Sequence, residues 1–541
     1  MRRKLSFSAG SRFAGLVLFV MIFSAGSAFG FGLEAKTDST AFATIQNFFF
    51  SPMQMSDYNF LGGGARARAM GGAFFAVSND PTAAFWNPAG LSLLDKAQMD
   101  LSFSSFMSRP EHTATLKSSV LNFGFSNKPQ YDKNQISSIS VVIPFKNWNK
   151  EMAVSVSYQV LSDIYQENEY ALINDTLQTN QGIPITNWKS ILTEKITGKL
   201  SAITLALGAK TFGSLSLGLG VNIYAGGFNS DVNLFYPKGF HQDITIDTLT
   251  GNTTVNLYEK FHPSIKTDYS GFNFTFGGMY QIDKLKLAAV VKTPFTLKEE
   301  NDVKLLVDYV VGGVLVDSYT RSLSQMFKTD RKWKMPVMIG FGSSYQLKDL
   351  TLAGDVEFRS YSKSKLTYRD NLANPTGDEI TTSLNWRDLT QFRIGGEYLV
   401  HTKYGSIPIR AGFRNDPKLF TNLHDSMEVY MEEHEYNIGE VTLLLPTYIK
   451  SKPGTEVGSW VNGNIFSFGT GIAWSQIKFD ITFEFAKYDD VEQKVVTEIV
   501  AFDRGRKKID YIMYEPNGRK EFSRKDSNKY NRIMVSFTGF F

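Results

Sequence analysis

Cysteine is absent from the 541 residues of the chain, and histidine occurs only six times. Without cysteine there is no disulfide framework, no thiolate nucleophile and no thiolate metal site. The sequence also contains no recognisable arrangement of serine, histidine and aspartate for nucleophilic catalysis. We therefore expect no enzyme activity, no catalytic residues, no bound metal and no cofactor.

Long apolar runs and an excess of one charge are also missing. The apolar run at residues 13–23 has about eleven residues, whereas a membrane-spanning helix needs ~20, and no second long run exists. Lysine and arginine total 57 against 53 aspartate and glutamate residues. The four excess charges lie in the first twelve residues, at Arg2, Arg3, Lys4 and Arg12. Because the remainder is balanced, we expect no nucleic-acid partner.

Residues 1–28 have the features of a secretory signal peptide. A basic start is followed by the apolar run and then by small residues. Cleavage after Ala28 or after Gly30 fits the small-x-small rule. A membrane anchor is the alternative interpretation, but the apolar run is short for that role. The sequence therefore predicts an exported protein.

Beyond residue 97 apolar and polar residues alternate with period two, which is typical of strands with two different faces. Near the C-terminus, for example, Ile477, Phe479 and Ile481 alternate with Lys478 and Asp480. Tight breaks lie near residues 146–150, 212–213, 283–284, 348–349, 401–406 and 475–476. Long polar connections lie between them, at about residues 107–135, 162–198, 226–271, 294–334, 361–390, 415–463 and 489–530.

Long connections that alternate strictly with short turns predict about fourteen strands, each of roughly 8–13 residues. These features describe an all-β fold, a transmembrane antiparallel β-barrel of the outer-membrane type. A soluble sandwich would also alternate, but it gives no reason for loops of this length. Residues 121–126 alternate too, and we assign them to the first long connection, which decides between fourteen and fifteen strands. We expect a barrel at residues 98–541 in the outer membrane of a Gram-negative-type bacterium.

The C-terminal strand supports this interpretation. One face of that strand carries Ile533, Val535, Phe537, Gly539 and the terminal Phe541. A terminal aromatic residue on an amphipathic strand resembles the sorting signal of the outer-membrane barrel-assembly machinery, which we expect as a partner. Outer-membrane lipids are expected partners as well. Lipopolysaccharide is expected to contact basic residues of the last long connection, namely Arg504, Arg506, Lys507 and Lys508.

Residues 29–97 do not follow the strand pattern and are rich in glycine and alanine. A phosphate-binding loop is disfavoured, because the segment has no Gly-Lys-Ser/Thr motif. Small residues let the backbone pack closely inside a lumen that is already lined by side chains. We therefore expect this segment to form a hatch, or plug, within the barrel.

The hatch segment resembles that of the FadL/TodX (OmpP1-like) family of outer-membrane transporters for long-chain fatty acids and other hydrophobic compounds. The resemblance rests on Arg68-x-x-Gly71-Gly72-Ala73, Asp80, and Asn87-Pro88-Ala89 followed by Gly90-Leu91. Weaker similarity continues along the barrel at residues 292–294, 355–362, 385–388, 395–398 and 410–413.

The resemblance implies passive uptake of long-chain fatty acids or other hydrophobic small molecules. In the family, ligand capture in the lumen, hatch movement and lateral release into the membrane follow one another. The alternative is a barrel of the same family that serves as a structural or protein-secretion component. The family's lateral opening arises from a kink in the third strand, whereas residues 151–161 contain no glycine or proline that predicts one, although a bulge is compatible with them.

Several residues are candidates for ligand binding or gating. Asn87, Pro88 and Ala89 fit either a gating element or a turn that seats the hatch. For Arg68 an ion pair with Glu357, Glu397 or Glu484 is favoured over capture of a ligand carboxylate. Aromatic candidates for either pocket lining or hatch packing are Phe74, Phe75, Phe85 and Trp86. Inward-facing candidates for attracting a carboxylate headgroup are Arg410 and Arg414.

Overall fold

The computed structural model of the chain describes residues 60–117, 122–127, 131–147, 150–174, 177–178, 184–185, 188–235, 242–248, 251–311, 314–322, 331–369, 379–384, 386–403, 405–419, 421–438, 441–502, 519–527 and 529–541. The predicted signal peptide, residues 29–59 of the predicted hatch and the basic cluster at residues 504–508 lie outside these ranges.

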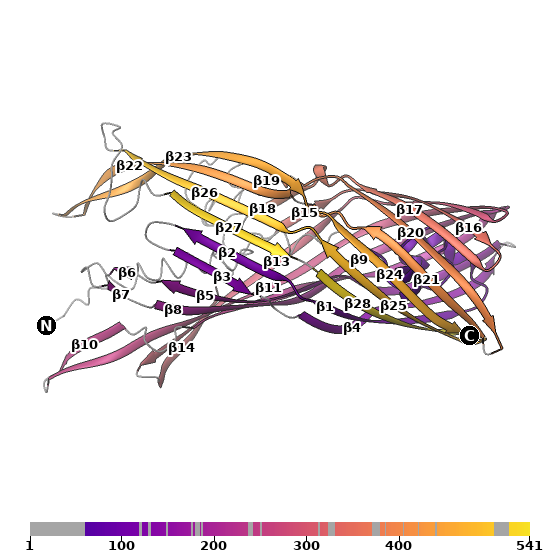
Figure 1. Cartoon of the computed structure of the whole chain (residues 1–541), viewed down its shortest axis with the longest axis horizontal. Coiled ribbons are helices and arrows are strands. Elements are labelled where there is room, and N and C mark those ends of the chain that lie inside the picture. Colours follow the sequence, from indigo (N-terminus) through magenta and orange to yellow (C-terminus); the bar gives the residue numbers. More distant parts are fainter. Residues whose placement is uncertain are drawn as a thin grey trace.

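Fourteen antiparallel strands close into a barrel (Figure 1). The last strand pairs with the first, so that Phe540 lies opposite Gln98 and Tyr530 opposite Ser108. In chain order the strands are β1 (Gln98–Ser108), β4 (Tyr131–Asn147), β5 (Lys150–Asn174), β8 (Trp188–Phe212), β9 (Leu215–Phe235), β11 (Gly251–Ile282), β12 (Leu285–Lys292), β16 (Met338–Leu347), β17 (Leu350–Arg359), β20 (Leu389–Thr402), β21 (Gly405–Asn415), β24 (Gly463–Ala473), β25 (Ile477–Tyr488) and β28 (Lys529–Phe540). The predicted fold and strand number are confirmed.

The two faces of the barrel wall differ as the alternation predicts. On β5, Ser155 and Ser157 are buried towards the lumen, while Val154 and Val156 are exposed on the outer face. On β25, Thr482 and Glu484 point inwards and Phe483 points outwards. An apolar outer face is what the hydrocarbon of a lipid bilayer requires.

Consecutive wall strands pair up to each of the six predicted short turns at one end of the barrel, and the structure describes every residue of the turns other than 148, 149 and 404. Four of the six turns place a residue at positive φ, with φ of 53° at Gly213, 49° at Asp283, 49° at Lys348 and 137° at Gly405. Positive φ is what two-residue hairpin turns need in order to match the twist of their strands. Short turns of outer-membrane barrels face the periplasm, so the opposite end is the extracellular one.

Much of the predicted loop sequence is strand, which is a difference from the expectation of strands of 8–13 residues. β5 has 25 residues and β11 has 32, because neighbouring strands continue to pair beyond the apolar band. The wall is extended past short breaks by three further strands, β13 (Phe295–Val311), β15 (Arg331–Met335) and β18 (Lys365–Arg369). Two more strands form hairpins: β10 (Gln242–Thr248) pairs with β11, and β14 (Val314–Ser322) pairs with β13. Period-two alternation fades there because water can solvate both faces of the extension.

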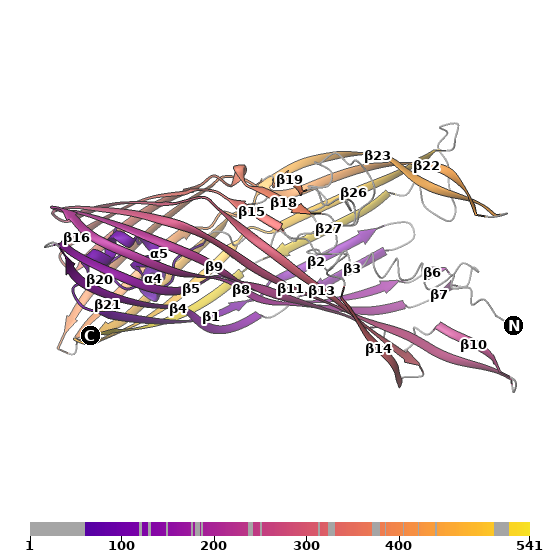
Figure 2. The same ribbon diagram turned by 180° about the vertical axis from the view of Figure 1, so that it is seen from behind.

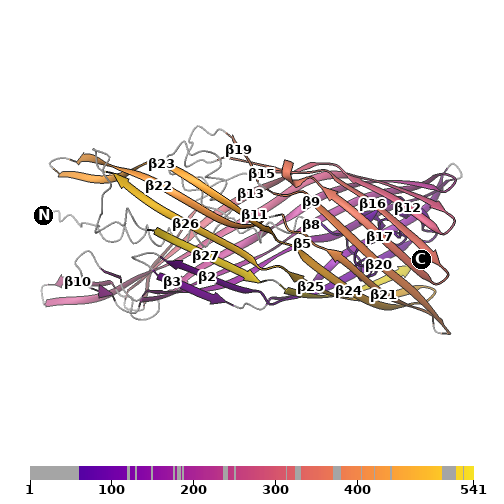
Figure 3. The same ribbon diagram turned by 45° about the horizontal axis from the view of Figure 1, so that its top comes forward.

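A second sheet of six strands lies beyond the extracellular end of the barrel (Figure 3, left). Its order is β23 (Val441–Trp460), β22 (Thr421–Ile438), β26 (Val491–Phe502), β27 (Arg519–Ser527), β2 (Glu111–Lys117) and β3 (Asn122–Asn127). The alternating residues after 121 form β3, which pairs with β2 and not with the barrel. Their assignment to the first long connection gives the correct count of fourteen. Small strands β6 (Leu177–Gln178), β7 (Pro184–Ile185) and β19 (Glu379–Ser383) and the 3-10 turn η2 (Tyr361–Lys363) complete the extracellular end.

Residues 60–97, which we call the lumen segment, lie inside the barrel near the short-turn end (Figure 2). The segment contains α4 (Ala65–Ala69), α5 (Ala83–Trp86) and the 3-10 helix η1 (Pro88–Leu93). α4 contacts β21, β24, β25 and β28, whereas η1 contacts β4, β5, β8, β9 and β11. Within the described ranges, no helix has the length and apolarity needed to cross a membrane.

Candidate functional site

The lumen segment fits the wall because inward-facing glycines of the strands leave room for its backbone. Gly395 on β20 and Gly412 on β21 are register partners. A Cβ on Gly412 would lie 2.0 Å from the Gly71 nitrogen, and one on Gly395 would lie 2.3 Å from the Met70 carbonyl oxygen. Gly71 itself has φ of 67°, a conformation that glycine adopts readily. The wall and the Arg68-x-x-Gly71-Gly72 motif are therefore complementary in shape.

The turn Asn87-Pro88-Ala89 occupies a second glycine-lined recess. Gly208, Gly218 and Gly277 lie side by side on β8, β9 and β11. An added Cβ would come within 2.5 Å of the turn at each of the three positions. These glycines were not among the predicted site residues. What they share is an inward position at the same level of neighbouring strands, and only the register between the strands reveals it.

Asn87 joins three parts of the molecule. Its side-chain amide nitrogen donates to the Phe75 carbonyl oxygen at 3.0 Å and to the Gly278 carbonyl oxygen on β11 at 3.2 Å. Its side-chain oxygen accepts from the Ala89 backbone nitrogen at 3.1 Å. Asn87 has no solvent exposure, so these bonds satisfy polar groups that water cannot reach. The turn thus fixes the lumen segment to the wall.

The four aromatic candidates form the packed interior of the lumen segment. Trp86 meets the Phe74 ring edge-on at 5.9 Å and donates from its indole nitrogen to the Gly63 carbonyl oxygen at 2.9 Å. Phe74, Phe75, Phe85 and Trp86 share a buried cluster with Val290 on β12 and Met338 on β16. None of the four lines the cavity described below, so their contacts fit packing against the wall.

Arg68 makes an ion pair with one of the three acids named as alternative partners for it. Its guanidinium lies 3.8 Å from the Glu484 carboxylate on β25 and donates to the Gly62 carbonyl oxygen at 3.1 Å. An arginine guanidinium keeps its proton in proteins, and the Glu484 carboxylate beside it favours the charged form. Arg68 is therefore protonated at neutral pH.

The other two acids expected near Arg68 bind different arginines. Glu357 pairs with Arg359 and Arg393 of the wall. Glu397 on β20 forms a two-point contact with Arg66, at 3.0 Å from Nε and 2.8 Å from Nη2. Sequence analysis missed Arg66, although it shares α4 with Arg68 and inward acids were already named as partners.

The two wall arginines proposed for headgroup capture have different surroundings. Arg410 lies between the Glu397 and Asp480 carboxylates, at 2.6 and 2.7 Å, and does not line the cavity. Arg414 donates to Glu484 at 2.6 Å and does line it. The geometry thus brings Arg414 and Arg68 together and leaves Arg410 in a separate ion-pair network.

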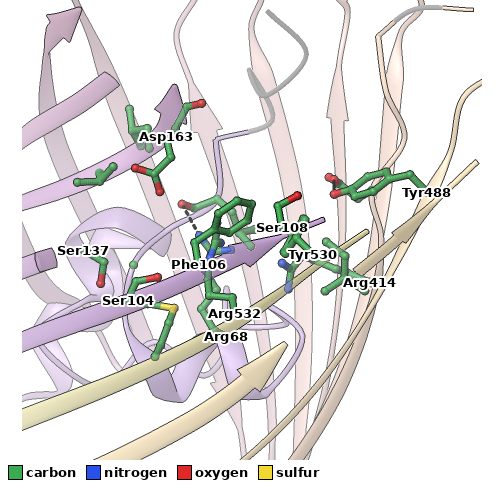
Figure 4. A pocket seen from close by; sticks show the side chains of 18 of the residues that line it. Arg68, Ser104, Phe106, Ser108, Ser137, Asp163, Arg414, Tyr488, Tyr530 and Arg532 are labelled. Carbon is green, nitrogen blue, oxygen red and sulfur yellow. Dashed lines mark hydrogen bonds between the residues drawn. The ribbon is translucent and has the colours of Figure 1, made fainter. Parts of the chain in front are cut away.

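A cavity of about 200 Å³ lies between the extracellular side of the lumen segment and the barrel wall (Figure 4). Five cationic side chains line it, with two acidic ones: Arg68, Arg414, Lys418, Lys529, Arg532, Asp163 and Asp416. Apolar surface comes from Leu61, Phe106, Leu161, Val461, Ile465 and Met534. The cavity therefore combines charge with apolar walls, a combination suited to an amphipathic molecule.

The cavity reaches a place where β4 and β5 separate. Their ladder runs from Asn147 opposite Lys150 to Ser138 opposite Gln159. From that point towards the extracellular end, β4 still pairs with β1 as far as Tyr131, and β5 still pairs with β8 as far as Asn174. No ladder joins the described residues of β4 and β5 there. We call this place the wall gap.

Two bulges lie at the start of the wall gap. On β4 the register with β1 shifts at Ser137, and on β5 the register with β8 shifts at Leu161. A bulge bends its strand away from a regular ladder, so two bulges on adjacent strands separate them. The third barrel strand is therefore irregular directly beyond Val160, even though residues 151–161 contain neither glycine nor proline.

Among the described residues, side-chain contacts join β4 to β5 across the wall gap, and β3 also lies beside β5. Lys133 on β4 lies 3.1 Å from the Asp163 carboxylate on β5, and Gln135 donates to the same oxygen at 2.5 Å. Farther out, the Tyr131 hydroxyl donates to the Glu167 carbonyl oxygen at 3.0 Å. Gln135 and Asp163 also line the cavity. The side chains that bridge the wall gap thus also form part of the cavity lining.

The sequence matches, over residues 51–430, the family model described as outer membrane protein transport protein (OMPP1/FadL/TodX). None of the curated proteins matches it. Among solved structures, a Pseudomonas aeruginosa FadL homologue has 13% identity and a TM-score of 0.50, with 89% of this chain and 99% of that chain covered.

Two further structures are toluene transporters. TodX from P. putida has 14% identity and a TM-score of 0.46, covering 89% of this chain and 99% of that chain. TbuX from Ralstonia pickettii has 15% identity and a TM-score of 0.44, covering 90% and 100%. The family match, with the closed barrel, confirms the resemblance and the outer-membrane location. The chain belongs to the OMPP1/FadL/TodX family of outer-membrane transporters of hydrophobic compounds.

Proposed function

We propose that the protein is a passive channel that takes up hydrophobic small molecules and releases them sideways through the wall gap. The observation that carries this proposal is that no ladder joins the described residues of β4 and β5 directly beside the lumen cavity, where side chains bridge the two strands. A transmembrane wall otherwise needs a continuous ladder, because lipid cannot satisfy free backbone groups. A stretch held by side-chain contacts, such as those of Lys133 and Gln135 with Asp163, is the part that opens at lowest cost.

The outer surface beside the wall gap supports this route. A recess of about 410 Å³ lies across β28, β1 and β4, lined by apolar side chains that include Phe103, Ile136 and Val535. Gln135 and Ser104 line both this recess and the lumen cavity. An apolar molecule that passes Gln135 would therefore enter an apolar recess at the lipid face, where burial stabilises it by ~25 cal/mol per Å².

In this proposal the lumen segment acts as the hatch. It fills the lumen between the cavity and the short-turn end, so an aqueous path straight through the barrel is blocked. The cavity and the wall gap favour transport over catalysis. They also favour it over the alternative of a structural or protein-secretion component, which would need neither feature.

A cross-linking experiment tests lateral release. Because the chain has no cysteine, Lys133→Cys with Asp163→Cys introduces the only two thiols, one on each side of the wall gap. A short bifunctional thiol reagent should then lower uptake of radiolabelled oleate to the level of cells without the protein. The uncross-linked variant should still take up oleate.

The matched control places the same cross-link across the intact ladder. Val141 on β4 lies opposite Val156 on β5, and both side chains face outwards. Cross-linking Val141→Cys with Val156→Cys should leave oleate uptake unchanged. If cross-linking at the wall gap also leaves uptake unchanged, lateral release at this site is wrong. If no variant and no wild-type protein takes up oleate or toluene while another protein co-purifies, the structural alternative is favoured.

A further inference from the structure

Four lysines gather on the outer face of the wall, on the strands β13, β15 and β18 that extend it. Leu297, Trp333 and Leu366 on these strands face inwards and share a buried cluster. Because side chains alternate along a strand, the residues next to them face outwards. The exposed outward residues include Lys298, Lys332, Lys334 and Lys365, which we call the lysine cluster.

The lysine cluster is compact because the strands that carry it pair with one another. Lys298 on β13 lies opposite Lys332 on β15. Lys334 on β15 lies opposite Lys365 on β18. Side chains directly opposite each other have Cβ atoms ~5 Å apart, and like charges in such a pair are destabilising. The fold thus holds two pairs of like charges side by side, an arrangement that an anion bound between them would stabilise.

The protein neutralises only part of this positive charge. Lys332 pairs with Glu379 on β19 at 2.7 Å. Glu300, two residues from Lys298 on the same face of β13, is a further exposed acid. The other three lysines form no ion pair with any residue in the described part of the chain. Four lysines and two acids leave an excess of two positive charges.

Farther from the membrane, the same outer face is balanced. Lys266 on β11 pairs with Asp268 at 3.0 Å, and Lys304 on β13 pairs with Asp302 at 3.5 Å. Contact with water alone therefore does not require unpaired lysines on this face. Protection of a free sheet edge does not explain them either, because β13, β15 and β18 each have a paired strand on both sides.

The lysine cluster lies at the extracellular boundary of the apolar band. On the membrane side of the cluster, Phe272 on β11, Ile339 on β16 and Phe358 on β17 are exposed on the outer face. Figure 2 shows β15 and β18 between the short-turn end of the barrel and the β22–β23 hairpin. Because the apolar band is embedded in hydrocarbon, the lysines beyond it are at the level of the lipid headgroups.

Phosphate is the headgroup chemistry that fits two adjacent pairs of lysines. A lysine ammonium is a compact charge that binds phosphate oxygens. A phosphate monoester carries about −1.5 to −2 charges at pH 7, which matches the excess of two positive charges. Lipopolysaccharide carries phosphates on the sugars to which its acyl chains are attached. A zwitterionic phospholipid, in contrast, brings a positive charge of its own.

We propose that the lysine cluster binds the phosphate groups of lipopolysaccharide in the surrounding outer leaflet. This site is distinct from residues 504–508, for which the same partner is expected. It is also separate from the transport route, because none of the four lysines lines the lumen cavity or the outer recess. The bound lipid anchors the barrel in the leaflet from outside.

Native mass spectrometry of the purified full-length protein in detergent tests the proposal. The probes are lipid A (the lipid anchor of lipopolysaccharide) with both phosphates, monophosphoryl lipid A and fully dephosphorylated lipid A. The fraction of protein with bound lipid should fall in that order. Phosphatidylglycerol, whose single phosphate is a diester, should bind more weakly than lipid A. Inorganic phosphate should not displace lipid A, because it has no acyl chains to contact the apolar band.

Paired substitutions identify the lysines responsible. Lys334→Gln with Lys365→Gln should weaken lipid A binding by about tenfold to thirtyfold, since each lysine near a membrane surface contributes roughly fivefold to the attraction of an anionic lipid. Lys334→Arg with Lys365→Arg keeps both charges and should retain the affinity.

The matched control is Lys266→Gln with Lys304→Gln. It also removes two lysines from the same outer face, but both of them pair with acids of the protein. Lipid A binding should be unchanged in this control. Heat-modifiable migration verifies that each barrel is folded.

Four results would overturn the proposal. Two concern the lipid: equal binding of phosphorylated and dephosphorylated lipid A, and binding of phosphatidylglycerol as tight as that of lipid A. The third is displacement by inorganic phosphate, which would identify a site for free phosphate. The fourth is a folded Lys334→Gln, Lys365→Gln variant that binds lipid A no more weakly than the Lys266→Gln, Lys304→Gln control. The wall-gap cross-link tests the transport function separately, because neither of its positions belongs to the lysine cluster.

Discussion

The side-chain amide of Asn87 donates a hydrogen bond to the main-chain carbonyl oxygen of Gly278 on β11, at 3.2 Å. This bond joins the lumen segment to a strand that lies far away in the chain. Gly277, the preceding residue, leaves the space that lets Asn87 approach the wall. One side chain therefore sets the position of the turn that follows it.

We predict that Asn87→Ala with Pro88→Ala assembles at normal levels but changes hydrophobic-solute uptake. The barrel ladder does not depend on this turn, whereas loss of Asn87 leaves buried polar groups unpaired at a cost of ~1–3 kcal/mol. Uptake of oleate and protease sensitivity of the lumen segment are the measurements. Asp95→Ala, at an exposed position of the same segment, is the control. Wild-type uptake together with wild-type protease sensitivity would mean that the motif is only a spacer.

Gly218→Ala should displace the Asn87-Pro88-Ala89 turn, because the new Cβ would lie 2.2 Å from the Ala89 nitrogen. Backbone atoms cannot give way as a flexible side chain can, and overpacking of this kind costs ~1–3 kcal/mol. Gly220→Ala is a matched control on the same face of β9, where the nearest atom would be 3.6 Å away. Amide hydrogen exchange of residues 83–93 should accelerate only in Gly218→Ala. Equal exchange in both variants would contradict the proposed seating.

The sequence predicted features that depend on local pattern. Alternation and turn spacing were sufficient for the fourteen strands. Small residues led to the expectation that residues 29–97 lie in the lumen, which is where the described residues 60–97 lie. Glu484 was among the expected partners of Arg68 because the period-two alternation of a strand shows which of its acidic residues face the lumen. Each of these properties is determined by residues that lie close together in the sequence.

Features that depend on register between distant strands were not predictable. Arg532 and Glu484 become opposite partners only when β25 pairs with β28, and Arg414 joins them from β21. The bulge at Leu161 has no glycine or proline signal, since ordinary residues can occupy a bulge. The ion pairs of Arg414 and Arg532 with Glu484, and the wall gap, therefore required the structure.

Arg66→Gln should loosen α4 without preventing barrel assembly. Arg66 holds Glu397 by two charge-assisted hydrogen bonds, and hydrogen bonds to charged groups contribute ~1.5–3 kcal/mol each. Glu397 keeps its contact with Arg410, so the wall itself should remain intact. Amide exchange within residues 65–72 should rise in Arg66→Gln and rise less in Arg66→Lys. Unchanged exchange in both variants would show that the packing of α4 alone holds the segment in place.

Deletion of Phe541 should lower the amount of folded barrel in the outer membrane. The Phe541 backbone nitrogen donates to the Ala97 carbonyl oxygen at 2.9 Å, next to the start of β1, so the last residue takes part in closing the barrel. Its ring is 81% exposed on the outer face, where we expect the assembly machinery to recognise it. Phe541→Ala keeps the backbone bond and removes the ring, and thus separates the two contributions.

The comparison variant is Phe212→Ala, since Phe212 is also an exposed outer aromatic at the short-turn end but lies within the chain. Heat-modifiable protein in outer-membrane fractions is the measurement. Deletion of Phe541 and Phe541→Ala should both lower this amount, whereas Phe541→Trp and Phe212→Ala should not. If only the deletion lowers it, the backbone bond to Ala97 matters and recognition of the ring is wrong. If neither lowers it, closure between β1 and β28 is sufficient for assembly, because eleven register pairs from Gln98 to Ser108 already join the two strands.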